Sequence, residues 1–129
     1  PAGLAAWTVE KFRAWSDSDG AIERRFTKDE LLTNIMLYWA TGTATSSCRL
    51  YYEMVHAEKF PPTGVRVDVP TGCALFPGEI VKPPRAWAER VFNVQRWTVM
   101  PRGGHFAAME EPELLVEDVR AFFRPLRGA

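Results

Sequence analysis

The stretch Arg96-Trp97-Thr98-Val99-Met100-Pro101-Arg102-Gly103-Gly104-His105-Phe106 brings a strand, a turn and a titratable side chain together in one short segment. Its β-branched and aromatic residues predict a strand over 96–100. The two glycines predict a tight turn, and the imidazole that follows them could act as a general base. On this local pattern alone, His105 could instead fill the turn and bond a backbone carbonyl. The second histidine, His56, has no comparable setting.

The segments on either side of this stretch predict an alternation of strands and helices. Alternating valines predict a strand over 65–69 that ends at Pro70, and a proline near a helix start predicts a helix over 84–91. Downstream, the apolar spacing after Pro112 predicts a last helix over 112–123. A strand, a helical crossover and a second strand form the βαβ unit, in which the strands are parallel. The sequence therefore predicts the end of a parallel α/β sheet.

The first part of the chain predicts helices. Apolar residues at helical spacing predict one over 4–15. The capping box Thr27-Lys28-Asp29-Glu30 predicts a second helix over 28–40. A third helix is expected over 46–57, before Pro61-Pro62 closes the segment.

Two strands do not form a stable sheet without further strands or cover on their faces. Either the helices of the first part provide that cover, or the rest of the sheet is missing from these 129 residues, and we favour the second. The change in pattern divides the chain into a helical segment, 1–62, and an α/β segment, 63–129.

The composition excludes several classes of partner. Sixteen basic and sixteen acidic residues cancel, which disfavours binding to nucleic acid or to an anionic membrane surface. No apolar run is long enough to span a bilayer, and the start has neither a methionine nor the plan of a signal peptide. Such a start is typical of a sequence that begins inside a fold. Two cysteines outside any CxxC spacing predict two reduced thiols.

The candidate catalytic groups fall in the two loops at the carboxyl ends of the predicted strands, where open α/β sheets gather reacting groups. The loop over 70–79 carries Glu79, and the turn after Met100 carries His105. A carboxylate that accepts a hydrogen bond from one imidazole nitrogen fixes the tautomer and leaves the other nitrogen free to take a proton. Glu79 could instead be a solvated residue that interacts with a helix dipole.

Other polar residues have simpler explanations. Amphipathic aromatic residues suit half-buried helix faces, which accounts for three tyrosines: Tyr38, Tyr51 and Tyr52. The dipole of the last helix accounts for three glutamates near its start: Glu110, Glu111 and Glu113.

A resemblance to a known family extends over essentially the whole chain. Gly103-Gly104-His105-Phe106, followed by Glu110-Glu111-Pro112-Glu113, resembles the histidine segment of microsomal-type epoxide hydrolases in the α/β-hydrolase superfamily. Val69-Pro70-Thr71-Gly72 with Glu79 resembles that family's acid loop. The segment 32–47 resembles its cap helices, and the segment 1–12 resembles the stretch just before them, in the family's order.

This resemblance implies a fold and a set of roles. The fold would be the C-terminal fragment of an α/β-hydrolase, with a helical cap segment followed by the last two parallel strands and helices of the core sheet. His105 would be the general base and Glu79 the acid that orients it. Tyr51 would be one of two cap tyrosines that donate a proton to the epoxide oxygen, and Tyr52 would be a variable neighbour.

In that family an aspartate attacks an epoxide carbon, and a water activated by the histidine hydrolyses the resulting ester to a vicinal diol. The implied partners are a small apolar epoxide, water and the N-terminal half of the same protein, and no metal or organic cofactor is implied. The implied role is detoxification and the catabolism of aromatic hydrocarbons. The location stays open between cytoplasm and membrane association, since any anchor would lie upstream. Four aromatic residues would suit an apolar pocket or an ordinary core: Trp7, Trp39, Phe76 and Phe106.

The chain lacks one group that this reaction needs. None of its aspartates stands in the Gly-x-Asp-x-Gly setting of the family's nucleophile. Covalent catalysis cannot start without its nucleophile, so the 129-residue chain alone is expected to be inactive. Two other interpretations stay open: another α/β-hydrolase, such as an esterase or a haloalkane dehalogenase, and a truncated product that acts by binding.

Overall fold

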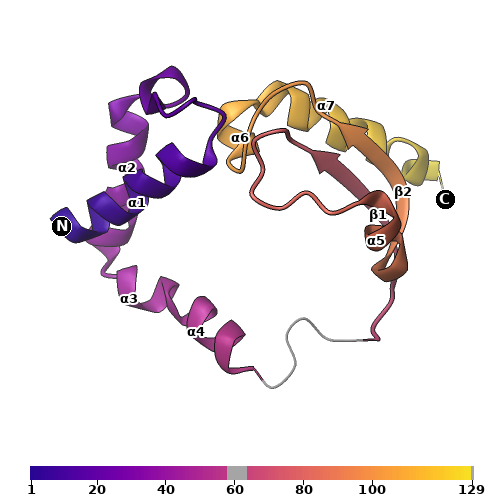
Figure 1. The fold of residues 1–129 in the computed structure, drawn as a ribbon, viewed down its shortest axis with the longest axis horizontal. Helices are drawn as coiled ribbons and strands as arrows, with labels where there is room; N and C mark the ends of the chain where they lie inside the picture. The colour runs from indigo at the N-terminus through magenta and orange to yellow at the C-terminus, as the bar shows by residue number, and fades with distance from the viewer. Residues whose placement is uncertain (58–63, 129) are drawn as a thin grey trace.

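The structure of this chain is a computed structural model that describes residues 1–57 and 64–128. Helices α1 to α4 gather on one side and the two strands with α5 and α7 on the other, and the turn between β2 and α6 lies where the two parts meet (Figure 1). The first part contains α1 Ala2–Trp15, the 3₁₀ helix η1 Ile22–Arg24, α2 Lys28–Thr41, α3 Ala44–Ser47 and α4 Arg49–His56. The second contains β1 Val67–Leu75, α5 Arg85–Val91, β2 Phe92–Val99, α6 Ala107–Glu110, α7 Pro112–Phe123 and the 3₁₀ helix η2 Pro125–Gly128.

The first two predicted helices are confirmed as α1 and α2. The capping box is also confirmed, since the Thr27 hydroxyl accepts from the Glu30 amide and the Glu30 carboxylate accepts from the Thr27 amide. The single third helix is wrong, because the segment divides at Cys48 into α3 and α4. The Cys48 amide donates to the Thr45 carbonyl, only three residues back, which tightens the turn and interrupts the α-helical pattern. The expected stop at Pro61-Pro62 lies outside the described residues.

An aromatic core joins the two parts of the molecule. Three side chains form a buried cluster: Phe12 of α1, Phe26 of the segment between η1 and α2, and Leu31 of α2. Phe106, which follows His105 in the turn after β2, packs against this cluster and stacks on Phe12 with 4.2 Å between ring centroids. Burial of these apolar side chains therefore attaches the histidine-bearing turn to α1 and α2.

The two strands form the predicted parallel pair, and α5 connects them. The predicted end of β1 is wrong, because the strand does not stop at Pro70 but continues to Leu75. Proline lacks an amide hydrogen, but the register shifts between Val67 and Pro70, and the missing donor is tolerated at such an irregularity. β2 begins earlier than predicted, at Phe92, because its pairing with β1 extends it to the end of α5.

The last predicted helix is confirmed as α7, which packs against both strands. Asp118 on α7 is 7% exposed and accepts hydrogen bonds from the side chains of Arg96 and Thr98 in β2, each at 2.7 Å. Phe122 lies so close to Gly72 of β1 that a Cβ at that glycine would come within 2.9 Å of its ring. These contacts fix α7 against the sheet.

The α/β class is therefore confirmed, with a two-stranded parallel sheet in the described residues. The predicted boundary between the segments 1–62 and 63–129 lies outside those residues, so the division stays a prediction. Cys48 and Cys73 are free thiols. Within the described parts of the chain, the helices are too short or too polar to cross a bilayer.

Candidate active site

His105 and Glu79 lie in contact at the carboxyl ends of the two strands. β2 ends at Val99 and the turn after it carries His105, while β1 ends at Leu75 and the loop after it carries Glu79. The imidazole Nδ1 is 2.6 Å from Glu79 Oε1, a distance typical of a charge-assisted hydrogen bond. With Nδ1–H donating to the carboxylate, Nε2 is free to accept a proton. The crossover brings the two residues together as expected, although the acid loop starts after Leu75 and not at Pro70.

The environment of Glu79 favours its ionised form. Burial raises the pKa of Glu79, but hydrogen bonds from the His105 ring and the Ile80 amide, both at 2.6 Å, outweigh it and hold the pKa below its ordinary value of 4.5. A carboxyl whose pKa falls on folding stabilises the protein above its unfolded pKa and loses that contribution as the pH falls through the folded value. The stabilising contribution of this ionised carboxylate is therefore present above a pH of about 4.5.

Backbone hydrogen bonds carry the sheet register up to this pair. The Met100 amide donates to the Leu75 carbonyl at 2.8 Å, and the Gly78 amide donates to the Gly103 carbonyl at 2.9 Å. Gly78 and Gly104 also form an isolated parallel bridge. Gly103 has a φ of 103°, in the left-handed region that residues other than glycine rarely adopt. The acid loop and the histidine turn thus continue the parallel pairing beyond the strands.

The other side of the histidine turn is attached to the end of α1. The His105 amide donates to the Trp15 carbonyl at 2.9 Å. The rings of Trp15 and Phe106 each lie edge-on to the imidazole, with centroids 5.3 Å away. A Cβ on Gly104 would come within 2.7 Å of the Trp15 carbonyl oxygen, so this close approach requires glycine. The helical part therefore touches the candidate base directly.

Tyr51, on α4, lines a hollow of about 450 Å³ beside this turn. Most of the lining consists of apolar and aromatic side chains from α1, α2 and α4, and Tyr38 of α2 is a second tyrosine in it. His105 and Glu79 line a different hollow, of about 490 Å³. Tyr51 therefore does not line the same hollow as the histidine–carboxylate pair, although Trp15 and Phe106 border the Tyr51 hollow and lie against the imidazole.

The neighbouring Tyr52 has a different environment. Its ring stacks on the His56 imidazole with 4.0 Å between centroids, and His56 Nδ1 lies 2.7 Å from the Tyr52 carbonyl oxygen. Tyr52 is not among the side chains that line the hollow. The structure thus separates the environments of the two adjacent tyrosines.

Three carboxylates that hold the turn escape prediction from the sequence. Glu110 and Glu111 are 8% and 7% exposed, so the helix-dipole explanation is wrong for these two residues. Glu110 accepts from the Asp17 amide, 93 residues away in sequence, and Glu111 pairs with Arg25, 86 residues away. The third carboxylate, that of Asp17, accepts from the Gly103 amide at 2.8 Å. No local pattern signals partners at such separations.

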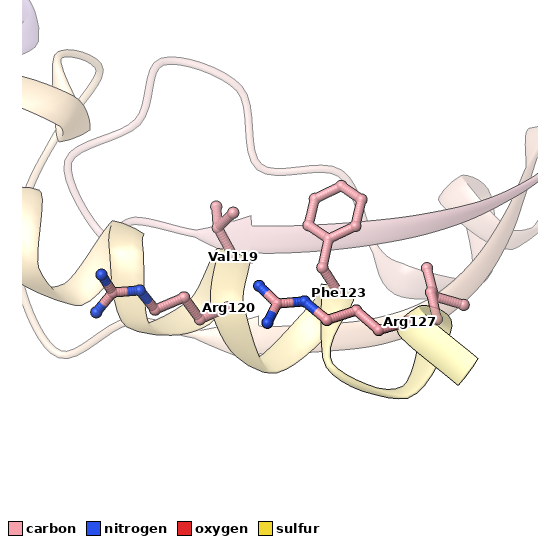
Figure 2. Close-up of a pocket in the computed structure, with 5 residues that line it drawn as sticks. Val119, Arg120, Phe123 and Arg127 are labelled. Carbon is pink, nitrogen blue, oxygen red and sulfur yellow. The ribbon is translucent and has the colours of Figure 1, made fainter. Parts of the chain in front are cut away.

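A separate hollow of about 320 Å³ is lined by residues of α7 and η2 (Figure 2). Val119 and Phe123 project from the same side of the helix, with Arg120 and Arg127 beside them. None of the predicted site residues lines this hollow. It is therefore not part of the candidate active site.

The histidine–carboxylate pair is accessible enough for proton transfer to water. The side chain of His105 is 38% exposed and that of Glu79 is 32% exposed. Such a pair can remove a proton from a nucleophilic water and stabilise the imidazolium that results.

Over residues 1–57 and 64–128, no group of three or more acidic, cysteine and histidine side chains is arranged to hold a metal ion.

Parallel strands that deliver first an acid and then a histidine define the C-terminal part of an α/β-hydrolase core. Solved structures agree with this class. Juvenile hormone epoxide hydrolase from the silkworm Bombyx mori matches with a TM-score of 0.88 and 34% identity, over 99% of this chain and 34% of that one. An enantioselective mutant of the epoxide hydrolase from Aspergillus niger matches with a TM-score of 0.78 and 30% identity, over 95% of this chain and 30% of that one.

Within that superfamily, the chain belongs to the epoxide hydrolases. It is 48% identical to epoxide hydrolase 1 of Sus scrofa, over 95% of this chain, and 47% identical to juvenile hormone epoxide hydrolase 2 of Ctenocephalides felis, over 92%. A putative epoxide hydrolase of Stigmatella aurantiaca is 43% identical over 99% of the chain. The chain spans only 28–29% of the length of these relatives. No protein-family model matches it.

Proposed function

We propose that this chain supplies the base, the orienting acid and one proton donor of an enzyme that opens an epoxide to a vicinal diol through an aspartyl ester. The observation that carries the proposal is the 2.6 Å contact between His105 Nδ1 and Glu79 Oε1 at the ends of adjacent parallel strands. That contact leaves Nε2 free to act on water. The relatives described above are all named as epoxide hydrolases, which supports the type of reaction.

The proposed reaction has two steps. An aspartate outside these 129 residues attacks an epoxide carbon, the carbon–oxygen bond breaks, and the Tyr51 hydroxyl donates its proton to the departing alkoxide. His105 Nε2 then takes a proton from water, and the water oxygen attacks the ester carbonyl carbon. Collapse of the tetrahedral intermediate passes its hydroxyl proton to the departing alkoxide, which releases the diol and restores the aspartate. The imidazolium, stabilised by Glu79, then returns its proton through water to the Tyr51 phenolate, so that both side chains regain their starting forms. These steps use side chains and water alone.

The hollow beside Tyr51 suits a small apolar epoxide. Trp7 and Phe106 are among its lining residues, and an apolar pocket with a few polar groups is the usual form of a small-molecule site. The other two aromatic candidates do not line it: Phe76 is buried, and Trp39 is half exposed. Removal of apolar epoxides, including those derived from aromatic hydrocarbons, is the role that this pocket would serve.

Replacement of Tyr51 by Phe distinguishes an epoxide hydrolase from another α/β-hydrolase. The test uses the complete natural protein that contains these residues, called the full-length protein below. Loss of one donor to a developing oxyanion costs about 10²–10³-fold in rate, so we expect Tyr51→Phe to slow ester formation from styrene oxide by up to that amount. Hydrolysis of the ester, once formed, should change little. Single-turnover rapid quench with styrene oxide measures both rates.

Tyr52→Phe is the matched control for this test, because Tyr52 carries the same hydroxyl on the same helix but stacks on His56. We expect it to leave both rates unchanged. A full-length protein that cleaves p-nitrophenyl acetate but forms no diol from styrene oxide, with or without Tyr51, would instead indicate an esterase.

The 129-residue chain alone is expected to show no turnover of styrene oxide, because no nucleophilic aspartate in the expected setting is present to form the ester. Its two strands also leave apolar side chains such as Val69 and Val99 largely exposed, and two strands rarely make a stable sheet. Diol formation by the purified chain, measured by mass spectrometry, would contradict this expectation. A cooperative melt without activity would favour a product that acts by binding.

A further inference from the structure

The buried carboxylate of Glu110 bridges two backbone amides that are far apart in sequence. Its Oε1 accepts from the Phe106 amide at 3.0 Å, and its Oε2 accepts from the Asp17 amide at 2.7 Å. Glu110 is 8% exposed, so water cannot readily replace it as the acceptor for these donors. One side chain thus binds the residue directly after His105 and the segment directly after α1.

Asp17 extends this bridge to the other side of the histidine. Its Oδ2 accepts from the Gly103 amide at 2.8 Å and from Arg25 at 3.2 Å. The His105 amide itself donates to the Trp15 carbonyl. Backbone amides before, at and after the histidine are therefore all attached to the end of α1, either directly or through a carboxylate.

The turn and the end of α1 are packed closely around the Glu110 carboxylate. A Cβ on Gly104 would lie 2.7 Å from the Trp15 carbonyl oxygen, 2.8 Å from the Asp17 amide nitrogen and 3.0 Å from Glu110 Oε1. The turn, the end of α1 and the Glu110 carboxylate meet at this one point. Any loss of the bridge is therefore transmitted to the backbone of the histidine.

We propose that Glu110 is a positioning residue, whose carboxylate locks the His105 turn to the end of α1 and so holds the imidazole in line with Glu79. The inference rests on the proposed function, in which His105 acts only in hydrolysis of the ester. A residue that positions the base should therefore affect that step alone. A general loss of structure would instead lower the active fraction and leave the rates of both steps in the surviving enzyme unchanged.

The test compares Glu110→Gln with wild type in the full-length protein, by single-turnover rapid quench with styrene oxide. Gln retains the size of Glu but places an NH₂ group opposite one of the two amide donors. This NH₂ group cannot accept a hydrogen bond, so that donor loses its partner. A misplacement of about 1 Å can cost about 10²-fold, so we expect hydrolysis of the ester to slow by about 10-fold or more. Ester formation should stay within about two-fold of wild type. Glu113→Gln is the matched control, because Glu113 is an exposed glutamate in the first turn of α7.

Two measurements keep the proposal falsifiable if Glu110→Gln does not fold. Glu110→Asp keeps both oxygens on a shorter side chain and should show a smaller effect on the same step. In wild type, hydrogen exchange should protect the amides of Asp17 and Phe106 together, since one side chain accepts from both. Unprotected Asp17 and Phe106 amides, or unchanged rates in a folded Glu110→Gln variant, would overturn the proposal.

Failure of the proposed function gives a different result. In that case wild type forms neither ester nor diol from the epoxide. The NMR signal of the proton between His105 Nδ1 and Glu79 then reports on positioning without turnover: it should be present in wild type and in Glu113→Gln and lost in Glu110→Gln. Its persistence in Glu110→Gln would also overturn the inference.

Discussion

Replacement of His105 by Gln in the full-length protein should stop the reaction after the ester has formed. Glutamine cannot take a proton from water, and loss of a general base costs about 10²–10⁴-fold. Formation of the ester does not use His105 in the proposed reaction, so this step should proceed near its normal rate. Intact-mass spectrometry after mixing with excess styrene oxide should show the protein carrying the mass of one substrate molecule, with almost no diol.

His56→Gln is the control for this substitution. His56 is the other histidine, is exposed, and contacts the Tyr52 ring and carbonyl. It should leave turnover unchanged. A His105→Gln variant that turns over at the normal rate would contradict the base role, and one that forms no adduct would assign His105 to the first step.

Replacement of Glu79 by Gln should produce the second-largest loss. The amide oxygen of glutamine can still accept from His105 Nδ1–H, but it carries no charge with which to stabilise the imidazolium, and the tautomer is no longer fixed. In a serine protease triad the equivalent loss of charge costs about 10⁴-fold. We expect hydrolysis of the ester to slow by about 10²–10⁴-fold while ester formation is retained.

The pH dependence gives an independent check on Glu79. Burial raises the pKa of this carboxyl, but hydrogen bonds from His105 and Ile80 outweigh it, so the pKa lies below 4.5. Glu79 should therefore stay ionised down to a pH below 4.5. A ¹³C NMR titration of the folded protein should therefore place the midpoint of Glu79 below that of an unfolded peptide. For the Glu79→Gln variant, Glu89→Gln is the matched control in the assay of ester hydrolysis, because Glu89 forms an exposed ion pair with Arg85 on α5. A midpoint above 4.5 would contradict the role of the His105 contact.

Local sequence patterns are sufficient to predict much of this fold. The capping box at Thr27 is a local device, so the start of α2 can be read directly. The parallel pairing of the strands follows from the intervening helix α5. The end of β1 could not be predicted, because Thr71 to Leu75 become a strand through pairing with β2 and not through propensity.

The candidate site divides in the same way. His105 and Glu79 could be found because strand ends and loop lengths place them at one edge of the sheet. The role of Tyr51 rests on a family resemblance, since nothing in its local sequence separates it from Tyr52. Glu110 could not be found, because its Asp17 partner lies 93 residues away and a buried acid looks the same in sequence as an exposed one.

The hydrogen bond from the Gly78 amide to the Gly103 carbonyl sets a limit on how this protein can diverge. It ties the acid loop to the histidine turn in the register that the strands begin. A residue inserted or deleted between Leu75 and Gly78 would shift that register and turn the Glu79 side chain away, whereas a substitution at the exposed Pro77 would leave the register intact. Pro77 should therefore tolerate substitution far better than this segment tolerates a change in length, and spacing is the feature to match when distant homologues are sought.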